Sequence, residues 1–209
     1  LPNFFVTLWQ ILAKMKNEER RMKKLLPPLV FNTQRSTIKL PASNSISNRA
    51  LLINALSGNT IPPENLSDSD DTHVMLRALQ TISPPKKGRE VFDIGAAGTA
   101  MRFLTAYLSV TPGEHIITGT ERMRHRPIGI LVDALRQLGA DIAYEGEEGF
   151  PPLRIVGHKD LEGGKLTVPG DVSSQYISAL LMIAPTLKGG LRLTLTGRIA
   201  SRPYLDMTL

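Results

Sequence analysis

Apolar residues recur at helical spacing in several stretches of the chain. Between Ile46 and Leu56, the residues Ile46, Ala50, Leu51 and Ile53 follow the three- and four-residue intervals of one helix face. We therefore expect these four side chains on the buried side of a helix. Comparable patterns predict further helices over residues 73–82, 100–108, 128–138 and 177–184, and a last one that begins near Tyr204.

Shorter apolar or alternating runs between turn residues predict strands, which lie at residues 37–40, 91–94, 115–118, 165–168 and 191–196. Residues 141–156 alternate on both sides of the polar stretch Glu145–Gly149 and predict a hairpin. The acidic stretch Leu66–Thr72 precedes the helix at 73–82. It lacks the glycine and final glutamate of a calcium loop, so we interpret it as a helix start that complements the helix dipole.

Three similar strand-to-helix turns divide the chain into a degenerate repeat, at Pro41–Ser45, Gly95–Thr99 and Pro169–Ser174. Each turn carries hydroxyl side chains or glycine. In each unit a second helix then starts at a polar or proline signal: Asp70-Asp71-Thr72, Arg126-Pro127-Ile128 and Arg202-Pro203-Tyr204. The pattern predicts an α/β (α+β) fold of three units about a pseudo-threefold axis. The second helix of the third unit has barely begun at Leu209, so we expect that unit to be truncated.

The three turns suggest an anion-binding function. A helix N-terminus carries unpaired N–H groups and the positive end of the helix dipole, so it favours an anion. Considered alone, Asp171 or Ser173 would be interpreted as a helix cap. Three convergent N-termini would instead focus positive potential on one small ligand. The residues thus predict a phosphorylated, carboxylated metabolite held by Ser, Thr, Gln, Arg and backbone N–H groups.

Composition excludes several other classes. The chain has no cysteine, its four histidines lack metal-ligand spacing, and no run of about 18 uncharged apolar residues could span a membrane. The net charge is +6, but residues 1–24 alone carry +4 and the remaining chain only +2. A nucleic-acid surface is therefore poorly supported. Residues 1–28 are expected to be an N-terminal extension outside the core. One alternative is a targeting segment, and another is a nucleic-acid or membrane module that uses residues 1–24.

Five ordered motifs carry a family resemblance: Leu40-Pro-Ala-Ser-Asn-Ser-Ile-Ser-Asn-Arg-Ala-Leu-Leu52, Gly98-Thr-Ala-Met-Arg102, Arg122-Met-Arg-His-Arg-Pro-Ile128, Ser173-Ser-Gln175 and Ser201-Arg-Pro-Tyr204. They resemble the 5-enolpyruvylshikimate-3-phosphate (EPSP) synthase family over residues 37–209. The related transferases that act on UDP-N-acetylglucosamine fit less well, because the Ser-Asn-Arg and Ser-Ser-Gln elements belong to the shikimate enzymes. Residues 1–28 have no counterpart.

The resemblance implies a two-domain fold, each domain built of three βαβαββ units, with the active site between the domains. Residues 29–209 would form the substrate-binding domain, incomplete, with the second domain mostly absent. The family transfers the enolpyruvyl group of phosphoenolpyruvate to the 5-hydroxyl of shikimate 3-phosphate, by addition and then elimination of phosphate, in the shikimate pathway. It needs no metal or organic cofactor. A cytoplasmic, monomeric full-length enzyme without a nucleic-acid or membrane partner is expected.

The resemblance also assigns site residues one by one. Ser45 and Arg49 would bind the carboxylate side of shikimate 3-phosphate. Its phosphate would be held by Ser173, Ser174 and Ser201. Gln175 and Tyr204 would lie beside the substrate. Phosphoenolpyruvate would be bound by Gly98, Arg122 and Gln175.

The chain departs from the family pattern at two positions. Asn44 stands where the family has a lysine that contacts both substrates, and Ala96 stands in place of an asparagine. An asparagine cannot supply positive charge, and losing a charged partner in a desolvated site costs about 2–5 kcal/mol. The family's acid–base carboxylates lie in its other half. The expectation is a chain that binds shikimate 3-phosphate weakly without turning it over; a non-catalytic binding half or a degenerate paralogue is the alternative.

Overall fold

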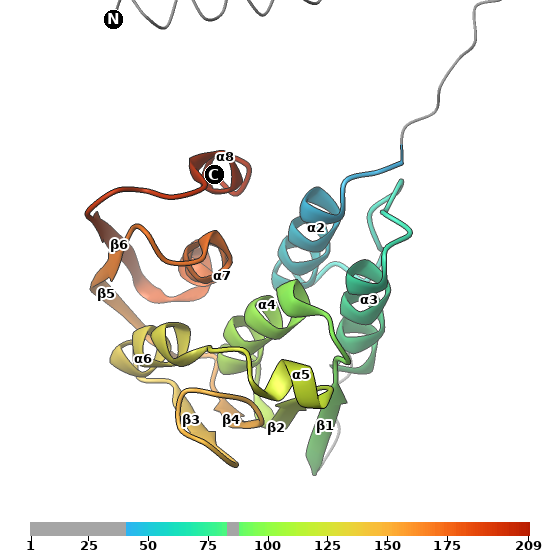
Figure 1. Cartoon of the computed structure of the whole chain (residues 1–209), viewed down its shortest axis with the longest axis horizontal. Helices are drawn as coiled ribbons and strands as arrows, with labels where there is room; N and C mark the ends of the chain where they lie inside the picture. The colour runs from blue at the N-terminus through green and yellow to red at the C-terminus, as the bar shows by residue number, and fades with distance from the viewer. Residues whose placement is uncertain (1–40, 83–87) are drawn as a thin grey trace, which may run out of the picture. The chain divides into compact units, whose positions relative to one another are not determined.

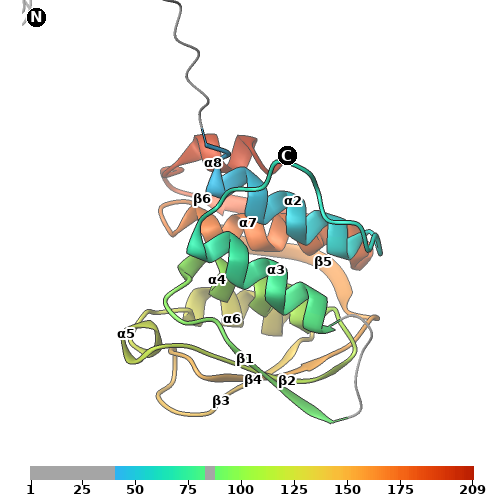
Figure 2. The same ribbon diagram turned by 90° about the vertical axis from the view of Figure 1, so that its right-hand side faces the viewer.

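Residues 41–82 and 88–209 are described by a computed structural model of the chain, shown in Figures 1 and 2. The predicted strand at 37–40 and the predicted extension at 1–28 therefore lie outside the described residues, and the domain boundary at residue 28 stays a prediction. No helix in the described ranges is both long and apolar enough to cross a membrane.

The middle of the chain forms a four-stranded mixed sheet in the order β1-β2-β4-β3. Strand β1 (Arg89–Asp93) pairs parallel with β2 (Gly113–Thr118). The strands β3 (Asp141–Tyr144) and β4 (Leu153–Gly157) pair antiparallel, and β4 also pairs antiparallel with β2. The predicted hairpin is thus confirmed, and its second strand is the one that joins it to the sheet.

Helices connect these strands in the predicted order. Helix α4 (Gly98–Ser109) links β1 to β2, and helix α6 (Gly129–Gln137) precedes the hairpin. A four-residue helix, α5 (Glu121–Arg124), lies between β2 and α6 and was not among the predicted helices. Residues 89–157 therefore form one complete βαβαββ unit with α5 added.

The following residues repeat the first four elements of that unit. Strand β5 (Glu162–Pro169), helix α7 (Ser174–Ile183) with a short 3₁₀ turn η1 (Ala184–Thr186), strand β6 (Lys188–Thr196) and helix α8 (Arg202–Asp206) follow one another. Strands β5 and β6 pair parallel, as β1 and β2 do. The repeat read from the sequence is therefore present in the second and third units.

The first unit contributes two helices, α2 (Asn44–Leu56) and α3 (Asp70–Ile82). Helix α3 begins three residues before the predicted start, so Asp70 and Asp71 lie inside its first turn. The expected buried face of α2 is partly wrong, because Ile46 is 55% and Ile53 47% exposed whereas Leu51 is buried. The face that packs inward instead carries Ser47, Asn48 and Arg49. Ser47, Arg49 and the Asn48 amide nitrogen make hydrogen bonds inside the protein, whereas Asn48 Oδ1 has no partner among the described residues.

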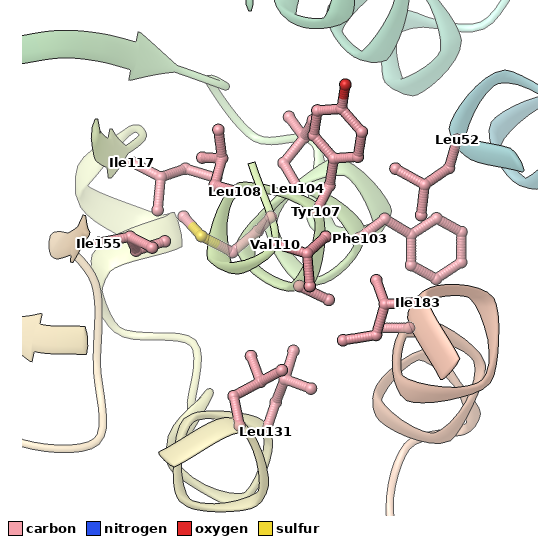
Figure 3. Packing of buried hydrophobic residues seen from close by; sticks show 14 of the residues in the cluster. Leu52, Phe103, Leu104, Tyr107, Leu108, Val110, Ile117, Leu131, Ile155 and Ile183 are labelled. Carbon is pink, nitrogen blue, oxygen red and sulfur yellow. The ribbon is translucent and has the colours of Figure 1, made fainter. Parts of the chain in front are cut away.

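Helix α4 is at the centre of the core. Eleven of its twelve residues are buried, as expected for a helix that is covered on all sides. Figure 3 shows Phe103 pointing toward Leu52 of α2 and Ile183 of α7, while Leu108 faces Ile117 of the sheet. Burying one such leucine or phenylalanine side chain contributes about 1.5–3 kcal/mol. The packing around α4 therefore fixes the relative positions of the helices that carry the predicted site residues.

Candidate functional site

The predicted site turns become the N-terminal ends of α2, α4 and α7, which lie side by side (Figure 2). Ser43 caps α2 by accepting from the backbone N–H of Ile46, at 3.4 Å, and Ser173 caps α7 by accepting from that of Gln175, at 3.3 Å. Ala97 precedes α4 and offers no side-chain cap. Three helix N-termini with small or hydroxyl side chains therefore lie in one region of the molecule.

Side-chain hydrogen bonds tie these helix ends together. Gln175 Nε2 of α7 donates to Thr99 Oγ1 of α4 at 3.2 Å, and Thr99 Oγ1 donates to Asp71 Oδ2 of α3 at 3.2 Å. Gln175 was predicted as a site residue, whereas Thr99 and Asp71 were not assigned roles. The two hydrogen bonds bring residues 71, 99 and 175 together. Contacts between residues so far apart in the sequence cannot be recognised from any spacing along it.

Asn44 is a second junction between helices. Its Oδ1 lies 2.8 Å from Asn48 Nδ2, 2.9 Å from Ser69 Oγ and 3.0 Å from Thr72 Oγ1, and all three groups can donate to it. A lysine ammonium has donors but no acceptor, so a lysine at this position would leave those groups without their shared acceptor. The three donors around Asn44 therefore suit a residue with an acceptor, such as asparagine. Their hydrogen bonds also join the N-termini of α2 and α3.

Arg49 lies behind Ser45 and is only 4% exposed. Its Nη1 donates to the Ser45 carbonyl at 2.9 Å, its Nη2 to Ser178 Oγ at 2.8 Å and its Nε to Thr208 Oγ1 at 2.7 Å. Burial lowers the pKa of the Arg49 guanidinium, and Tyr204 opposes that shift. Arginine nevertheless stays charged in proteins, so positive charge lies just inside the α2 N-terminus. The guanidinium also lies 6.0 Å from the Tyr204 ring centroid.

Arg102 occupies the corresponding place in α4. It is 4% exposed, and its guanidinium donates to the carbonyl of Gly98 at 3.1 Å and to that of Pro127 at 3.0 Å. Tyr176 of α7 donates to the same Pro127 carbonyl at 2.6 Å. Burial lowers the pKa of Arg102 as well. Each of the two helices thus holds a buried cation one turn in from a predicted site residue.

The predicted phosphoenolpyruvate residues Gly98 and Arg122 are not in contact through any hydrogen bond or ion pair in the described ranges. The arginine that lies against Gly98 is Arg126, because a Cβ added at Gly98 would be 2.8 Å from Arg126 Cζ. Arg122 lies exposed on α5. Three arginines in five residues were visible in the sequence, but only the turn of the chain before α6 places Arg126 over the start of α4.

The remaining predicted residues lie at the starts of α7 and α8. Ser173 and Ser174 form the first turn of α7, and Ser201 precedes α8 with a left-handed φ of +54°. A non-glycine residue with positive φ is uncommon and carries strain. Gly170 pairs with the segment before Ser201, accepting from the backbone N–H of Ala200 at 2.8 Å. The two serine-bearing turns are therefore neighbours.

A cleft of about 590 Å³ opens beside this region. Asn44 and the start of α3 line one side, and the turn Ile94–Ala97 lines the other. Within residues 41–82 and 88–209, no group of three or more His, Asp or Glu side chains is arranged to hold a metal ion. The side chains around the cleft include the carboxylates of Asp70 and Asp71, the imidazole of His73 and the guanidinium of Arg77.

Comparison with known proteins places these features in a family. A family model for EPSP synthase (3-phosphoshikimate 1-carboxyvinyltransferase) matches residues 31–89 and 81–209. A 3-phosphoshikimate 1-carboxyvinyltransferase of Bacteroides fragilis is 65% identical over 175 residues, covering 84% of this chain and 41% of that protein. One from Shewanella halifaxensis is 44% identical over 193 residues, covering 83% and 45%. The chain thus spans less than half the length of these relatives.

A solved structure of EPSP synthase from Acinetobacter baumannii matches the described fold with a TM-score of 0.66. It is 24% identical, and the match covers 79% of this chain and 41% of that one. At this identity the likeness supports the fold, and it agrees with the three-unit architecture expected from the repeat.

Proposed function

The chain belongs to the EPSP synthase family, and we propose that it supplies the shikimate 3-phosphate side of an enolpyruvyl transferase. The reaction would move the enolpyruvyl group of phosphoenolpyruvate to the 5-hydroxyl of shikimate 3-phosphate, with release of phosphate. The observation that carries the proposal is the group of helix N-termini joined through Gln175, Thr99 and Asp71. Such a group suits an anionic ligand that also has hydroxyl groups.

The proposed residue roles are those that the resemblance to the family implies. Ser173 and Ser174 at the start of α7, with Ser201 from the neighbouring turn, would hold the phosphate. Ser45 and Arg49 would bind the carboxylate, and Tyr204 would lie beside the ring. In the structure Arg49 donates to protein groups only, so it would bind the ligand by exchanging some of these partners or act through its buried charge.

The phosphoenolpyruvate side is proposed to use Gly98, Gln175 and Arg122. Arg126 is added to this set because its guanidinium lies against Gly98 at the start of α4. Two positive groups near a helix N-terminus would stabilise a phosphate or carboxylate. The acid and base groups of the transfer would come from the part of the enzyme that corresponds to the relatives' remaining length.

The same proposal describes a monomeric, cytoplasmic enzyme without nucleic-acid or membrane partners. In support, the chain beyond residue 24 carries a net charge of only +2. A charge that small gives little attraction to nucleic acid or to anionic lipid.

Binding of shikimate 3-phosphate to the 209-residue chain, measured by calorimetry, tests the proposal. The double change Ser173→Ala with Ser174→Ala should weaken binding at least about tenfold, because two hydrogen bonds to a charged group are lost. Ser57→Ala, at the opposite end of α2, is the matched control and should leave the affinity unchanged. No binding by the unmodified chain, or equal losses in the control, would refute the proposal.

A second candidate is a non-catalytic chain that binds shikimate 3-phosphate, and the three donors gathered on Asn44 Oδ1 favour it. Mixing the chain with the remaining part of the Bacteroides fragilis enzyme and phosphoenolpyruvate, then measuring phosphate release, separates the two. Sustained release supports the enzyme. Binding without release, with release gained only by Asn44→Lys, supports the second candidate.

A further inference from the structure

Three polar side chains from three helices form a chain of two hydrogen bonds that ends at Gln175, and the donor of each bond is fixed. Asp71 of α3, Thr99 of α4 and Gln175 of α7 are joined by two contacts of 3.2 Å. Neither Asp71 nor Thr99 has an assigned role in the reaction proposed above. Their arrangement determines which end of the Gln175 amide faces a ligand.

The direction follows from what each group can donate. An aspartate carboxylate only accepts hydrogen bonds, and a threonine hydroxyl has a single proton to give. Thr99 gives that proton to Asp71 Oδ2, so its oxygen can only accept from Gln175. The amide nitrogen of Gln175 must therefore face Thr99. Oε1 of Gln175 is left with no donor among the described residues.

The environment of Asp71 keeps this direction fixed. Its Oδ1 is out of contact with solvent and has no hydrogen-bond partner in the described part of the chain. Apart from Thr99, no side chain in those ranges donates to the carboxylate. Burial makes an unmet acceptor costly; Oδ1 already bears that cost, and the Thr99 proton spares Oδ2 from it. Reversing the Thr99 hydroxyl would leave both carboxylate oxygens unpaired.

We propose that Asp71 and Thr99 are positioning residues that present Gln175 Oε1 as an acceptor for a ring hydroxyl of the ligand. This rests on the proposed function, since the ligand is taken to be the hydroxylated ring of shikimate 3-phosphate. Asp71→Asn reverses the direction of both hydrogen bonds. An asparagine amide can donate to Thr99, which frees the Thr99 proton for Gln175 Oε1. The Gln175 amide would then turn and offer a donor where it offered an acceptor.

Side-chain amide NMR of the ligand-free chain, labelled with ¹⁵N-glutamine, tests the orientation of the Gln175 amide without any ligand. The Gln175 amide protons should show slow exchange in the unmodified chain and in Thr99→Ser. That protection should be lost in Thr99→Val and in Asp71→Asn. Asp133→Asn on α6 makes the same charge change elsewhere and should alter nothing. Identical Gln175 signals in all variants would overturn the proposal.

Calorimetry with shikimate 3-phosphate and its 4-deoxy-4-fluoro and 5-deoxy-5-fluoro analogues tests the ligand half, because fluorine can accept a hydrogen bond weakly but cannot donate one. In the unmodified chain and in Thr99→Ser, one analogue should bind about tenfold more weakly than the parent, which is the effect of one hydrogen bond left unmade. Asp71→Asn should narrow that difference, because the turned amide would donate to the fluorine. If the difference is unchanged in Asp71→Asn, the acceptor role is wrong. If the unmodified chain binds no shikimate 3-phosphate, the proposed function fails and the acceptor role with it, while the NMR result still decides the orientation of Gln175.

Discussion

Helix α2 begins at Asn44 and helix α4 at Gly98, and each carries an arginine one turn in from a predicted binding residue. Arg49 donates to the carbonyl of Ser45, and Arg102 to the carbonyl of Gly98. Both arginine residues are 4% exposed. The second helix repeats the N-terminal chemistry of the first, as two units of one repeat would.

Beyond the first turn the two helices differ. Helix α4 is covered on nearly all sides, whereas α2 leaves Ile46 and Ile53 about half exposed and turns Ser47 and Asn48 inward. Both helices have side-chain hydrogen bonds at their starts, through Asn44 in α2 and through Thr99 in α4. Farther along, α4 is held mainly by apolar packing, whereas the inward face of α2 also uses hydrogen bonds.

The largest expected contrast is in packing. Leu104→Ala in α4 removes a side chain with no exposed surface and should lower the unfolding free energy by about 2–5 kcal/mol. Ile53→Ala in α2 removes a side chain that is 47% exposed and should cost less than about 1 kcal/mol. Urea unfolding followed by circular dichroism measures both. Equal losses would mean that the exposed face of α2 is covered in solution.

The two buried arginines should have separate structural effects. Arg49→Met and Arg102→Met should each cost about 1–3 kcal/mol, because buried acceptors lose a charged donor. Arg49 bonds Thr208 and Tyr204, so its loss should raise hydrogen exchange around α8. Arg102 bonds Pro127, so its loss should raise exchange near residues 126–128. Exchange mass spectrometry that finds the same pattern for both variants would contradict this separation.

Asn44 tests whether hydrogen bonds hold the start of α2. Asn44→Ala should lower stability by about 1–2 kcal/mol, because Asn48, Ser69 and Thr72 lose a shared acceptor. Asn44→Lys should cost at least as much, since an ammonium cannot accept. Thermal unfolding measures both against Asn59→Ala in the exposed loop after α2. A stabilising Asn44→Lys would show that the network can rearrange around a lysine.

The smallest effect is expected at the start of α4. Gly98→Ala would bring a Cβ into the space of the Arg126 guanidinium, but that group is the end of an exposed, flexible side chain and can move. The cost should stay below about 1 kcal/mol, offset in part by the better helix propensity of alanine. Adding Arg126→Ala should remove the remaining penalty in a double-mutant cycle. A large loss that Arg126→Ala does not relieve would place the obstacle in the backbone.

The positions of most helices and strands could be predicted from the amino-acid sequence. The periods of apolar residues located the helices, the strands in the described ranges and the hairpin, because each element buries one face at its own repeat. The predicted starts of α2, α4 and α7 agree with the observed ones to within about three residues. The motif resemblance to EPSP synthases followed from the same turns and agrees with the family match.

Which faces of those elements are buried, and which side chains meet, depends on the tertiary packing. The apolar pattern placed Ile46 and Ile53 inside, but α2 instead packs a polar face inward, and Ser47 and Arg49 on that face are hydrogen-bonded to neighbouring segments. The sequence left Asp71 and Thr99 without roles and did not show that Arg126 lies against Gly98, since contacts between distant residues have no period along the chain. Only the packing of α3, α4 and α7 around the core brings residues 71, 99 and 175 into line and decides that Gln175 offers an acceptor.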